Sequence, residues 1–324
     1  AHATFAEAVQ TAAAIESEGE RAGALRAIAE AQAQAGQADA ARATFAQAVQ
    51  TAAAIADEWW RAVALREIAA AQAQAGQFPE AEQTAAAIMD EGRRAEALRA
   101  IAAAQAEAGQ SDAAHATFAE AVQTAAAIES EWSRAAALRA IAAAQARAGH
   151  VAEALQTAAA IERERERAWA LGTIAVAQAR AGHVAEALQT AAAIESETWR
   201  AWALREIAAA QAQAGHVAEA LQTAAAIERE RERAWAHQSI AIAQARAGLR
   251  ADAVQTAAAI RVDHADHLPA IAQALLDVGD RHHLKQVLML GATDLRAAFA
   301  LCGVLAQAYP DQATAVAQVV NEQR

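Results

Sequence analysis

A short internal repeat constrains this chain more than any other feature of its sequence. The dipeptide Ala-Gly closes a similar stretch of residues seven times, and successive glycines lie 33 or 40 residues apart. These glycines are Gly36, Gly76, Gly109, Gly149, Gly182, Gly215 and Gly248. Similarity at such a period is typical of solenoids, in which each unit is too small to bury its own apolar face and is completed by its neighbours.

Each unit is predicted to contain two helices. Leu204, Ile207 and Ala208 recur at the spacing of one helical face, and Gly215 can adopt the left-handed conformation that ends a helix. A second helix is expected to follow and to end in the hexapeptide Gln-Thr-Ala-Ala-Ala-Ile, which occurs eight times. The longer units carry seven extra residues, such as 42–48, which lengthen this second helix by two turns without rotating its apolar face much.

The composition supports an all-helical fold. Alanine accounts for 112 of the 324 residues, whereas aromatic residues make up only 4%. Alanine favours helix, and a sheet would need more β-branched and aromatic side chains. The single Cys302 excludes a disulfide scaffold, and its apolar surroundings indicate packing rather than a nucleophile. The predicted fold class is an all-α, right-handed α-solenoid with a diverged helical cap at the C-terminus.

The repeat boundaries predict three parts. Residues 1–20 are expected to form the second helix of a truncated repeat, because residues 1–18 are identical to residues 114–131 in the middle of a unit. Residues 21–263 are predicted to form seven repeats, and residues 264–324 a degenerate repeat followed by the cap. Four helices are expected in this last part, at Ala265 to Val278, Arg281 to Leu290, Asp294 to Tyr309 and Asp311 to Val320.

The longer units resemble a known repeat family. The spacing of Gly36, Ala41, Phe45 and Ala48 is similar to that in the second half of a tetratricopeptide repeat, and Gly109 begins the same spacing again. The first helix departs from that family by carrying Leu, Ile and Gln in place of bulky aromatic residues. The resemblance covers about residues 1–279, and it implies a groove in which extended peptides are held.

Charge and motifs exclude several functions. The net charge of −12 argues against an extended nucleic-acid surface, and no uncharged run of 18 apolar residues predicts a membrane span. The sequence contains neither a phosphate-binding loop nor a nucleophile elbow, so no enzymatic activity and no cofactor are predicted. The default expectation for localisation is the cytoplasm.

Histidines provide two weaker signals. His264, His267, His282 and His283 lie near aspartates in the C-terminal part and could hold Zn²⁺, but a hydrated cap surface is the favoured interpretation. Three others, at positions 150, 183 and 216, follow the glycine of their units. Because earlier units carry Gln at that position, these histidines are interpreted as polar turn residues.

Two rows of arginines recur along the repeats. The first row heads each first helix, directly after an acidic linker, and is expected to form ion pairs between units. It consists of Arg21, Arg61, Arg94, Arg134, Arg167, Arg200 and Arg233. The second row lies five residues further on, on the helix face opposite the apolar stripe, and consists of Arg26, Arg66, Arg99, Arg139 and Arg205.

Three tryptophans stand beside the second row. Trp169, Trp202 and Trp235 occupy one position in consecutive units, where earlier units carry Gly, Val, Glu and Ala. Trp and Arg are common at binding hot spots, and arginine can bind a carboxylate through two hydrogen bonds. Two interpretations are open: these indoles line a binding groove with the second arginine row, or they pack between helices.

The leading functional prediction is a non-enzymatic scaffold that binds a protein or peptide, with acidic or apolar side chains, along this concave groove. The alternative is a sensor or spacer array cut from a larger signalling protein or enzyme, with its effector domain upstream. A metal-binding C-terminal region is a third, weaker alternative. The sequence identifies neither the ligand nor the oligomeric state.

Overall fold

The computed structural model describes residues 2–292 and 294–310, and every regular secondary-structure element among these residues is a helix. The all-α solenoid fold predicted from the sequence is confirmed. The helices are α1 (His2–Ala13), α2 (Glu18–Gln34), α3 (Ala38–Ala53), α4 (Glu58–Gln74), α5 (Phe78–Ala86), α6 (Glu91–Glu107), α7 (Ser111–Ala126), α8 (Glu131–Arg147), α9 (Val151–Ala159), α10 (Glu164–Arg180), α11 (Val184–Ala192), α12 (Glu197–Gln213), α13 (Val217–Ala225), α14 (Glu230–Arg246), α15 (Arg250–Ala258), α16 (His264–Asp277), α17 (Arg281–Gly291) and α18 (Leu295–Ala308).

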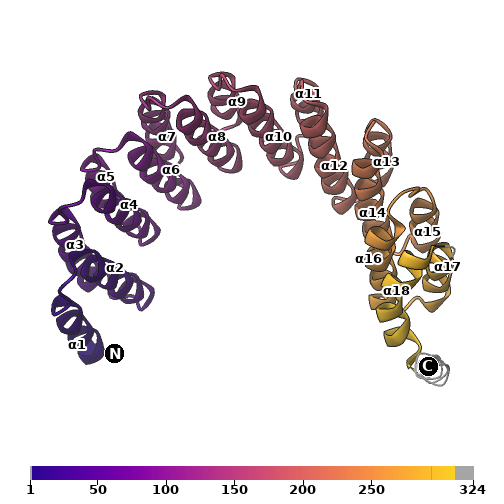
Figure 1. Ribbon diagram of the computed structural model, residues 1–324, viewed down its shortest axis with the longest axis horizontal. Coiled ribbons are helices and arrows are strands. Elements are labelled where there is room, and N and C mark those ends of the chain that lie inside the picture. The colour runs from indigo at the N-terminus through magenta and orange to yellow at the C-terminus, as the bar shows by residue number, and fades with distance from the viewer. Residues whose placement is uncertain (1, 293, 311–324) are drawn as a thin grey trace. The chain divides into compact units, whose positions relative to one another are not determined.

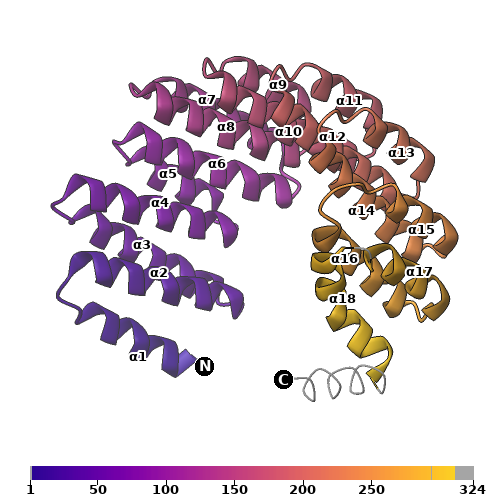
Figure 2. The ribbon, with the colours of Figure 1, turned by 45° about the vertical axis from the view of Figure 1, so that its right-hand side comes forward.

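The chain divides into two compact units, Ala1–Ala170 and Leu171–Arg324. In the first unit, the first helices of successive repeats (α2, α4, α6 and α8) pack side by side as one layer, and α3, α5, α7 and α9 form a second layer behind them (Figures 1 and 2). In the second unit, α12, α14 and α16 form the first layer, and α11, α13, α15 and α17 lie behind them. One face of each unit is therefore built from first helices only.

Each first helix ends at the glycine that the repeat pattern singled out. The seven glycines have φ between 74° and 89°, a region in which a side chain would be strained. At Gly182, for example, the glycine N–H donates to the Ala179 carbonyl, and the next N–H, of His183, donates to the Gln178 carbonyl. This is a Schellman turn, which satisfies carbonyl groups at the end of a helix. The turn therefore fixes where the second helix starts.

The first helices begin earlier than the sequence suggested. The acidic residues interpreted as a linker form the first helical turn instead: α14 starts at Glu230 and includes Glu232. In the first unit, a Ser or Asp precedes the helix and its side chain accepts a backbone hydrogen bond, as Asp57 does from Trp60 at 3.0 Å. Carboxylates in a first turn are favourable because the helix dipole is positive there.

The arginines that head the first helices cap other helices rather than pairing with acids. In six of the seven repeats, one Nη1–H donates to the carbonyl of the isoleucine six residues earlier, as Arg200 does to Ile194 at 3.1 Å. This carbonyl lies just beyond the preceding second helix, where the dipole is negative and a cation is favoured. The prediction of ion pairs is therefore wrong for this row, except at Arg134, which also lies 3.6 Å from Glu162.

The core is built mainly from alanine, with one or two buried Leu or Ile residues in each first helix of the repeats. The glutamine four residues before the glycine is buried in every repeat, and the threonine of the hexapeptide is buried in most of them. In two repeats the side-chain oxygen of the glutamine accepts a hydrogen bond from the threonine of the hexapeptide, at 2.7 Å between Gln72 and Thr84 and at 2.8 Å between Gln145 and Thr157. Such bonds offset the cost of burying a polar group.

The C-terminal part follows the prediction as far as the structure describes it. Three of the four expected helices are present as α16, α17 and α18, and the fourth, at residues 311–320, lies outside the described residues. Leu268, Leu275, Leu284 and Leu301 bring larger side chains into the core here than the alanines that dominate the core of the repeats. Among the described helices, none combines the length and apolar character that crossing a membrane requires.

Overpacking tests the alanine core. Ala208 is fully buried on α12, so we expect Ala208→Leu to lower the free energy of unfolding by about 1–3 kcal/mol. The matched control is Ala218→Leu on the exposed side of α13, which is expected to change it by less than about 0.5 kcal/mol. Urea denaturation measures both. Equal midpoints for the two variants would contradict the assignment of the buried face.

Candidate functional site

The three predicted tryptophans are half-buried, and each contacts a neighbouring repeat. The Trp169 ring on α10 lies under the Arg139 guanidinium of α8, 4.5 Å from its central carbon. The Trp202 ring on α12 covers Gly172 of α10, and its Cζ3 lies 2.8 Å from the position that a Cβ would occupy there. Trp235 on α14 meets the His267 ring of α16 edge to face, with centroids 4.6 Å apart. These indoles thus fill space between successive first helices while keeping part of their surface exposed.

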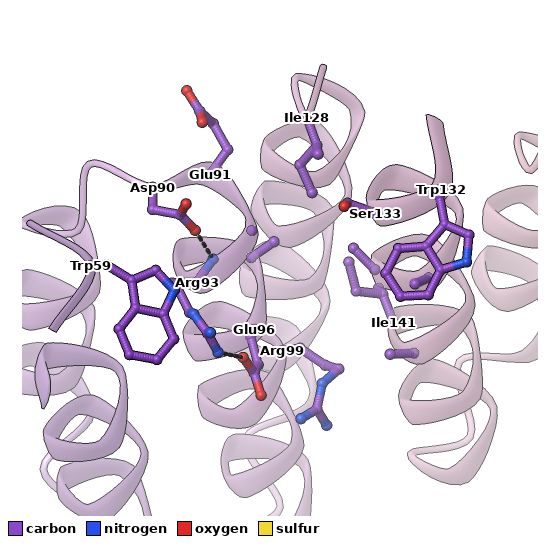
Figure 3. A pocket seen from close by; sticks show the side chains of 15 residues that line it. Trp59, Asp90, Glu91, Arg93, Glu96, Arg99, Ile128, Trp132, Ser133 and Ile141 are labelled. Carbon is purple, nitrogen blue, oxygen red and sulfur yellow. Dashed lines mark hydrogen bonds and ion pairs between the residues drawn. The ribbon is translucent and has the colours of Figure 1, made fainter. Parts of the chain in front are cut away.

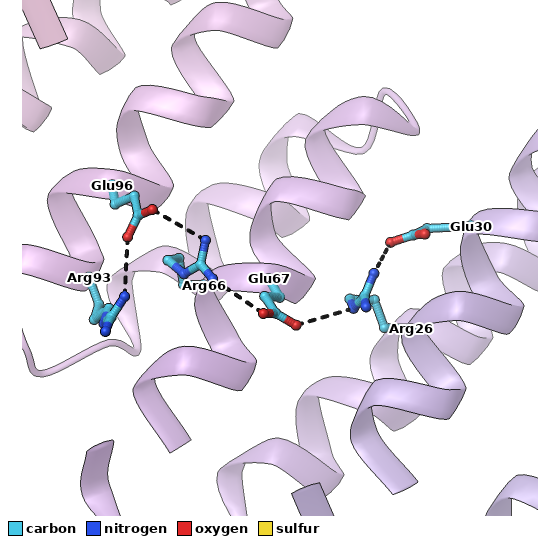
Figure 4. Close-up of polar contacts among 6 residues, drawn as sticks. All are labelled: Arg26, Glu30, Arg66, Glu67, Arg93 and Glu96. Atoms are coloured by element: carbon cyan, nitrogen blue, oxygen red, sulfur yellow. Dashed lines mark hydrogen bonds and ion pairs between the residues drawn. The ribbon is translucent and has the colours of Figure 1, made fainter. Parts of the chain in front are cut away.

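Most of the second arginine row is occupied by carboxylates of the chain itself. In the first unit a continuous set of ion pairs joins α2, α4 and α6 (Figure 4). Arg26 contacts Glu30 and Glu67, while Arg66 lies 3.3 Å from both Glu67 and Glu96. Further along, Arg139 pairs with Glu166 at 3.2 Å and Arg205 with Glu232 at 3.0 Å. These four guanidinium groups bind neighbouring first helices to each other.

Arg99 is the exception in this row. Its half-buried guanidinium has no hydrogen bond or ion pair with any described residue. Burial lowers the pKa of Arg99, the Glu96 carboxylate raises it, and the positive charges of Arg147 and Arg66 lower it further. Arginine remains protonated nonetheless, so a positive charge without a direct ion pair lies partly out of water at this point.

An open cleft lies over Arg99, between α6 and α8 (Figure 3). Its volume is about 500 Å³, and α8 contributes an apolar wall that includes Ala136, Ala140 and Ile141. Ala136 occupies the repeat position of the three tryptophans. In the next pair of first helices the indole of Trp169 covers Arg139, whereas a methyl group at position 136 leaves Arg99 uncovered. The cleft therefore exists because a small residue stands where an indole could fill the space.

The rim of the cleft carries two tryptophans that the sequence reading passed over. Trp59 and Trp132 are 52% and 63% exposed, at the first turns of α4 and α8. The Trp59 ring also lies 5.4 Å from the Arg93 guanidinium, which in turn contacts Glu96 (Figure 3). Their signal in the sequence was a large apolar side chain in the first turn, two residues before a heading arginine, where the other repeats carry Gly, Arg or Thr. Exposed indoles at a cleft are typical of binding surfaces.

A second cleft of about 720 Å³ lies between α2 and α4, and Trp60 contributes to its lining. The repeat position of the three tryptophans is again occupied by smaller residues here, Gly23 and Val63. Both clefts separate first helices that are connected through a long second helix, since α3 and α7 have 16 residues each whereas α5 and α9 have 9. The seven-residue insertions therefore coincide with the open positions on the first-helix face.

The C-terminal histidines have separate surroundings. His267 is fully buried, and its Nδ1 lies 2.8 Å from the Gln238 side-chain oxygen. His283 pairs with Asp280, whose carboxylate caps α17, and His282 is exposed. The side chain of His264 lies outside the described residues. The structure thus does not gather His267, His282 and His283 into one ligand set among the residues it describes.

Comparisons with known proteins assign no family. The chain matches no family model, and no curated protein matches it either. Among solved structures it is similar to Ton1535 of Thermococcus onnurineus, with a TM-score of 0.38 and 19% identity over 94% of this chain and 96% of that one. It is also similar to a signal transduction ATPase with numerous domains from Pyrococcus horikoshii that has a tetratricopeptide repeat sensor, with a TM-score of 0.34 and 16% identity over 97% of this chain. The match spans about half of that protein, 53% of its length. The tetratricopeptide resemblance stays a prediction.

A pair of glycine substitutions tests the packing role of Trp202. Gly172→Ala is expected to destabilise the protein because the new methyl group meets the indole, whereas Gly23→Ala has open space and should stabilise it by about 0.4–1 kcal/mol. In a Trp202→Ala background the penalty of Gly172→Ala should disappear. Thermal melting of the four variants measures this coupling. Equal effects of the two glycine substitutions would show that the indole does not press on Gly172.

Proposed function

We propose that this protein is a non-enzymatic scaffold that binds a peptide segment of a partner protein on its first-helix face, with the cleft between α6 and α8 as the central site. The observation that carries this proposal is the unpaired guanidinium of Arg99 at the base of that cleft, beneath exposed indoles. A partly buried charge without a counterion is unfavourable in the free protein. A ligand that supplies a carboxylate would remove this cost.

The lining of the cleft indicates what the ligand should contain. Of the charged residues that line it, Asp90 accepts the backbone N–H of Arg93, Arg93 pairs with Glu96, and Glu91 is an exposed carboxylate at the start of α6. Arg99 is therefore the group left to bind an anion. The alanine wall of α8 and the ring of Trp132 suit an apolar side chain. We infer a ligand in which an acidic residue has apolar neighbours.

The remaining predicted groove residues belong to the same proposal. Trp169 lies in the first unit, on a first helix as the cleft does, and Trp202 and Trp235 lie on first helices of the second unit. The exposed part of each indole is proposed to contribute to binding on the first-helix face of its own unit. The paired arginines would then act mainly by fixing the spacing of the first helices. A sensor or spacer role within a larger protein, the sequence-based alternative, stays a prediction.

A filled cleft tests the proposal. Ala136→Trp should place an indole over Arg99, as Trp169 lies over Arg139, and should therefore preserve the fold while blocking the site. The probes are fluorescein-labelled decapeptides with one Glu between Leu and Phe residues, and matched peptides in which Gln replaces Glu. Fluorescence anisotropy should show binding of the Glu peptides to the parent and at least tenfold weaker binding to Ala136→Trp, because a hydrogen bond to a charged group contributes about 1.5–3 kcal/mol.

Two controls make the result specific. Arg99→Gln should abolish the preference for Glu over Gln peptides, whereas Ala218→Trp, on the exposed side of α13, should bind like the parent. Circular dichroism melts establish that each variant is folded. Equal binding by the parent and Ala136→Trp, or no binding of any peptide by the parent, would refute this cleft as the site.

A further inference from the structure

A cluster of potential metal ligands lies between the second helices α7 and α9, in the layer behind the first-helix face. It consists of His115 on α7, His150 at the start of α9 and Glu153 in the first turn of α9. One ligand atom from each residue can be chosen so that all three lie within 4.8 Å of one another. Among the described residues, no other group of three His, Cys, Asp or Glu side chains has its ligand atoms this close together. The cluster plays no part in the proposed peptide site.

The equivalent junction two repeats earlier in the chain, between α3 and α5, has a different set of side chains. There Arg42, Gln77 and Glu80 stand at the positions of His115, His150 and Glu153. The Arg42 Nε lies 3.0 Å from the Glu80 carboxylate, so a permanent cation neutralises the acid across the two helices. At the later junction both polar partners of the glutamate are histidines. The His115 imidazole stands where the earlier junction has the Arg42 guanidinium.

The imidazoles are already placed around the carboxylate. The His115 Nδ1 lies 3.2 Å from the Glu153 Oε1. The His150 ring lies 6.0 Å from the His115 ring, and Phe118 packs against it edge to face at 5.8 Å. The buried Nε2 of His150 has no hydrogen-bond partner among the described residues. A buried ring nitrogen without a partner is costly, and coordination can stabilise the imidazole that carries it.

We propose that His115, His150 and Glu153 bind one Zn²⁺ ion, which joins α7 to α9. Two imidazoles and a carboxylate are a ligand set that Zn²⁺ favours, whereas Mg²⁺ and Ca²⁺ prefer oxygen ligands. Bonds of about 2.0–2.2 Å to the ion place tetrahedral ligands about 3.3–3.6 Å apart, so ligand atoms within 4.8 Å of one another need to close by little more than about 1 Å. His115 is exposed, which leaves a fourth position open to water.

The other turn histidines provide an internal control. His183 and His216 occupy the position of His150 in later repeats, next to glutamates at the position of Glu153. The second helices before them are short, however, and lack the seven-residue insertion in which His115 lies. Each of these later turns therefore has one histidine fewer. The proposal accordingly predicts a single Zn²⁺ per chain.

The test is calorimetric titration of the whole protein, purified without a histidine tag and freed of metal with a chelator, with Zn²⁺ at pH 7.5. We expect one saturable site. The variant H115R/H150Q recreates the Arg42, Gln77 and Glu80 junction, so it should fold normally and bind Zn²⁺ at least about 100-fold more weakly, since even outer-shell substitutions cost about 10–100-fold. The matched control H183Q/H216Q should bind like the parent.

Two further readouts separate this site from others. Co²⁺ bound at the site should give the intense visible absorption of tetrahedral coordination in the parent and in H183Q/H216Q but not in H115R/H150Q. Zn²⁺ should raise the melting temperature of the parent and not that of H115R/H150Q, because a ligand stabilises the state that binds it. Zn²⁺ binding retained in H115R/H150Q, binding lost in the variant H282Q/H283Q, or no saturable site in the parent would overturn the proposal.

Discussion

The contact between neighbouring first helices depends on a few large or charged side chains set among alanines. Alanine gives each helix a smooth surface that permits close approach but adds little that is specific to one neighbour. Junctions between first helices differ in two side chains: the one at the position of the second arginine row, and the one at the position of the three tryptophans in the next repeat. Glu96 holds Arg66 by an ion pair, Trp169 covers Arg139, and Trp202 rests on Gly172. Where the second of these side chains is that of Ala136, the contact is missing and a cleft remains.

Much of this fold could be predicted because its rules are local. A glycine at a fixed interval ends a helix, and a run of periodic apolar residues fills the space before it, so the helix pairs follow from the sequence. The role of the heading arginines could not be predicted in the same way. An arginine after an acidic stretch suggests an ion pair, but the carbonyl that Arg200 caps belongs to the backbone of Ile194, and a backbone acceptor leaves no mark in the side-chain pattern.

The candidate site likewise could be predicted from the sequence only in part. Sequence variation within the repeats identified the arginine row and the position of Trp169, Trp202 and Trp235, both of which lie where first helices meet. Sequence variation offered no reason to select Ala136, because the cleft there results from the small size of that side chain. Arg99 likewise looked equivalent to its neighbours in the row. α8 carries Ser133, Ala136 and Ala140 at the repeat positions from which Glu166, Glu96 and Glu67 reach an arginine of the preceding first helix. Which positions face that arginine is known only from the packing of the helices.

The buried glutamines have a consequence for how the helices can move. Two alanine-faced helices have no ridges deep enough to stop one from sliding along the other, because each methyl group meets nearly the same surface one turn further on. The bonds from Gln72 to Thr84 and from Gln145 to Thr157 exist at only one axial offset. A slip of one turn, about 5.4 Å, would separate the pair and leave the buried glutamine oxygen without that hydrogen bond. In those two repeats a single polar contact thus acts as a latch that sets the longitudinal alignment of the helix pair.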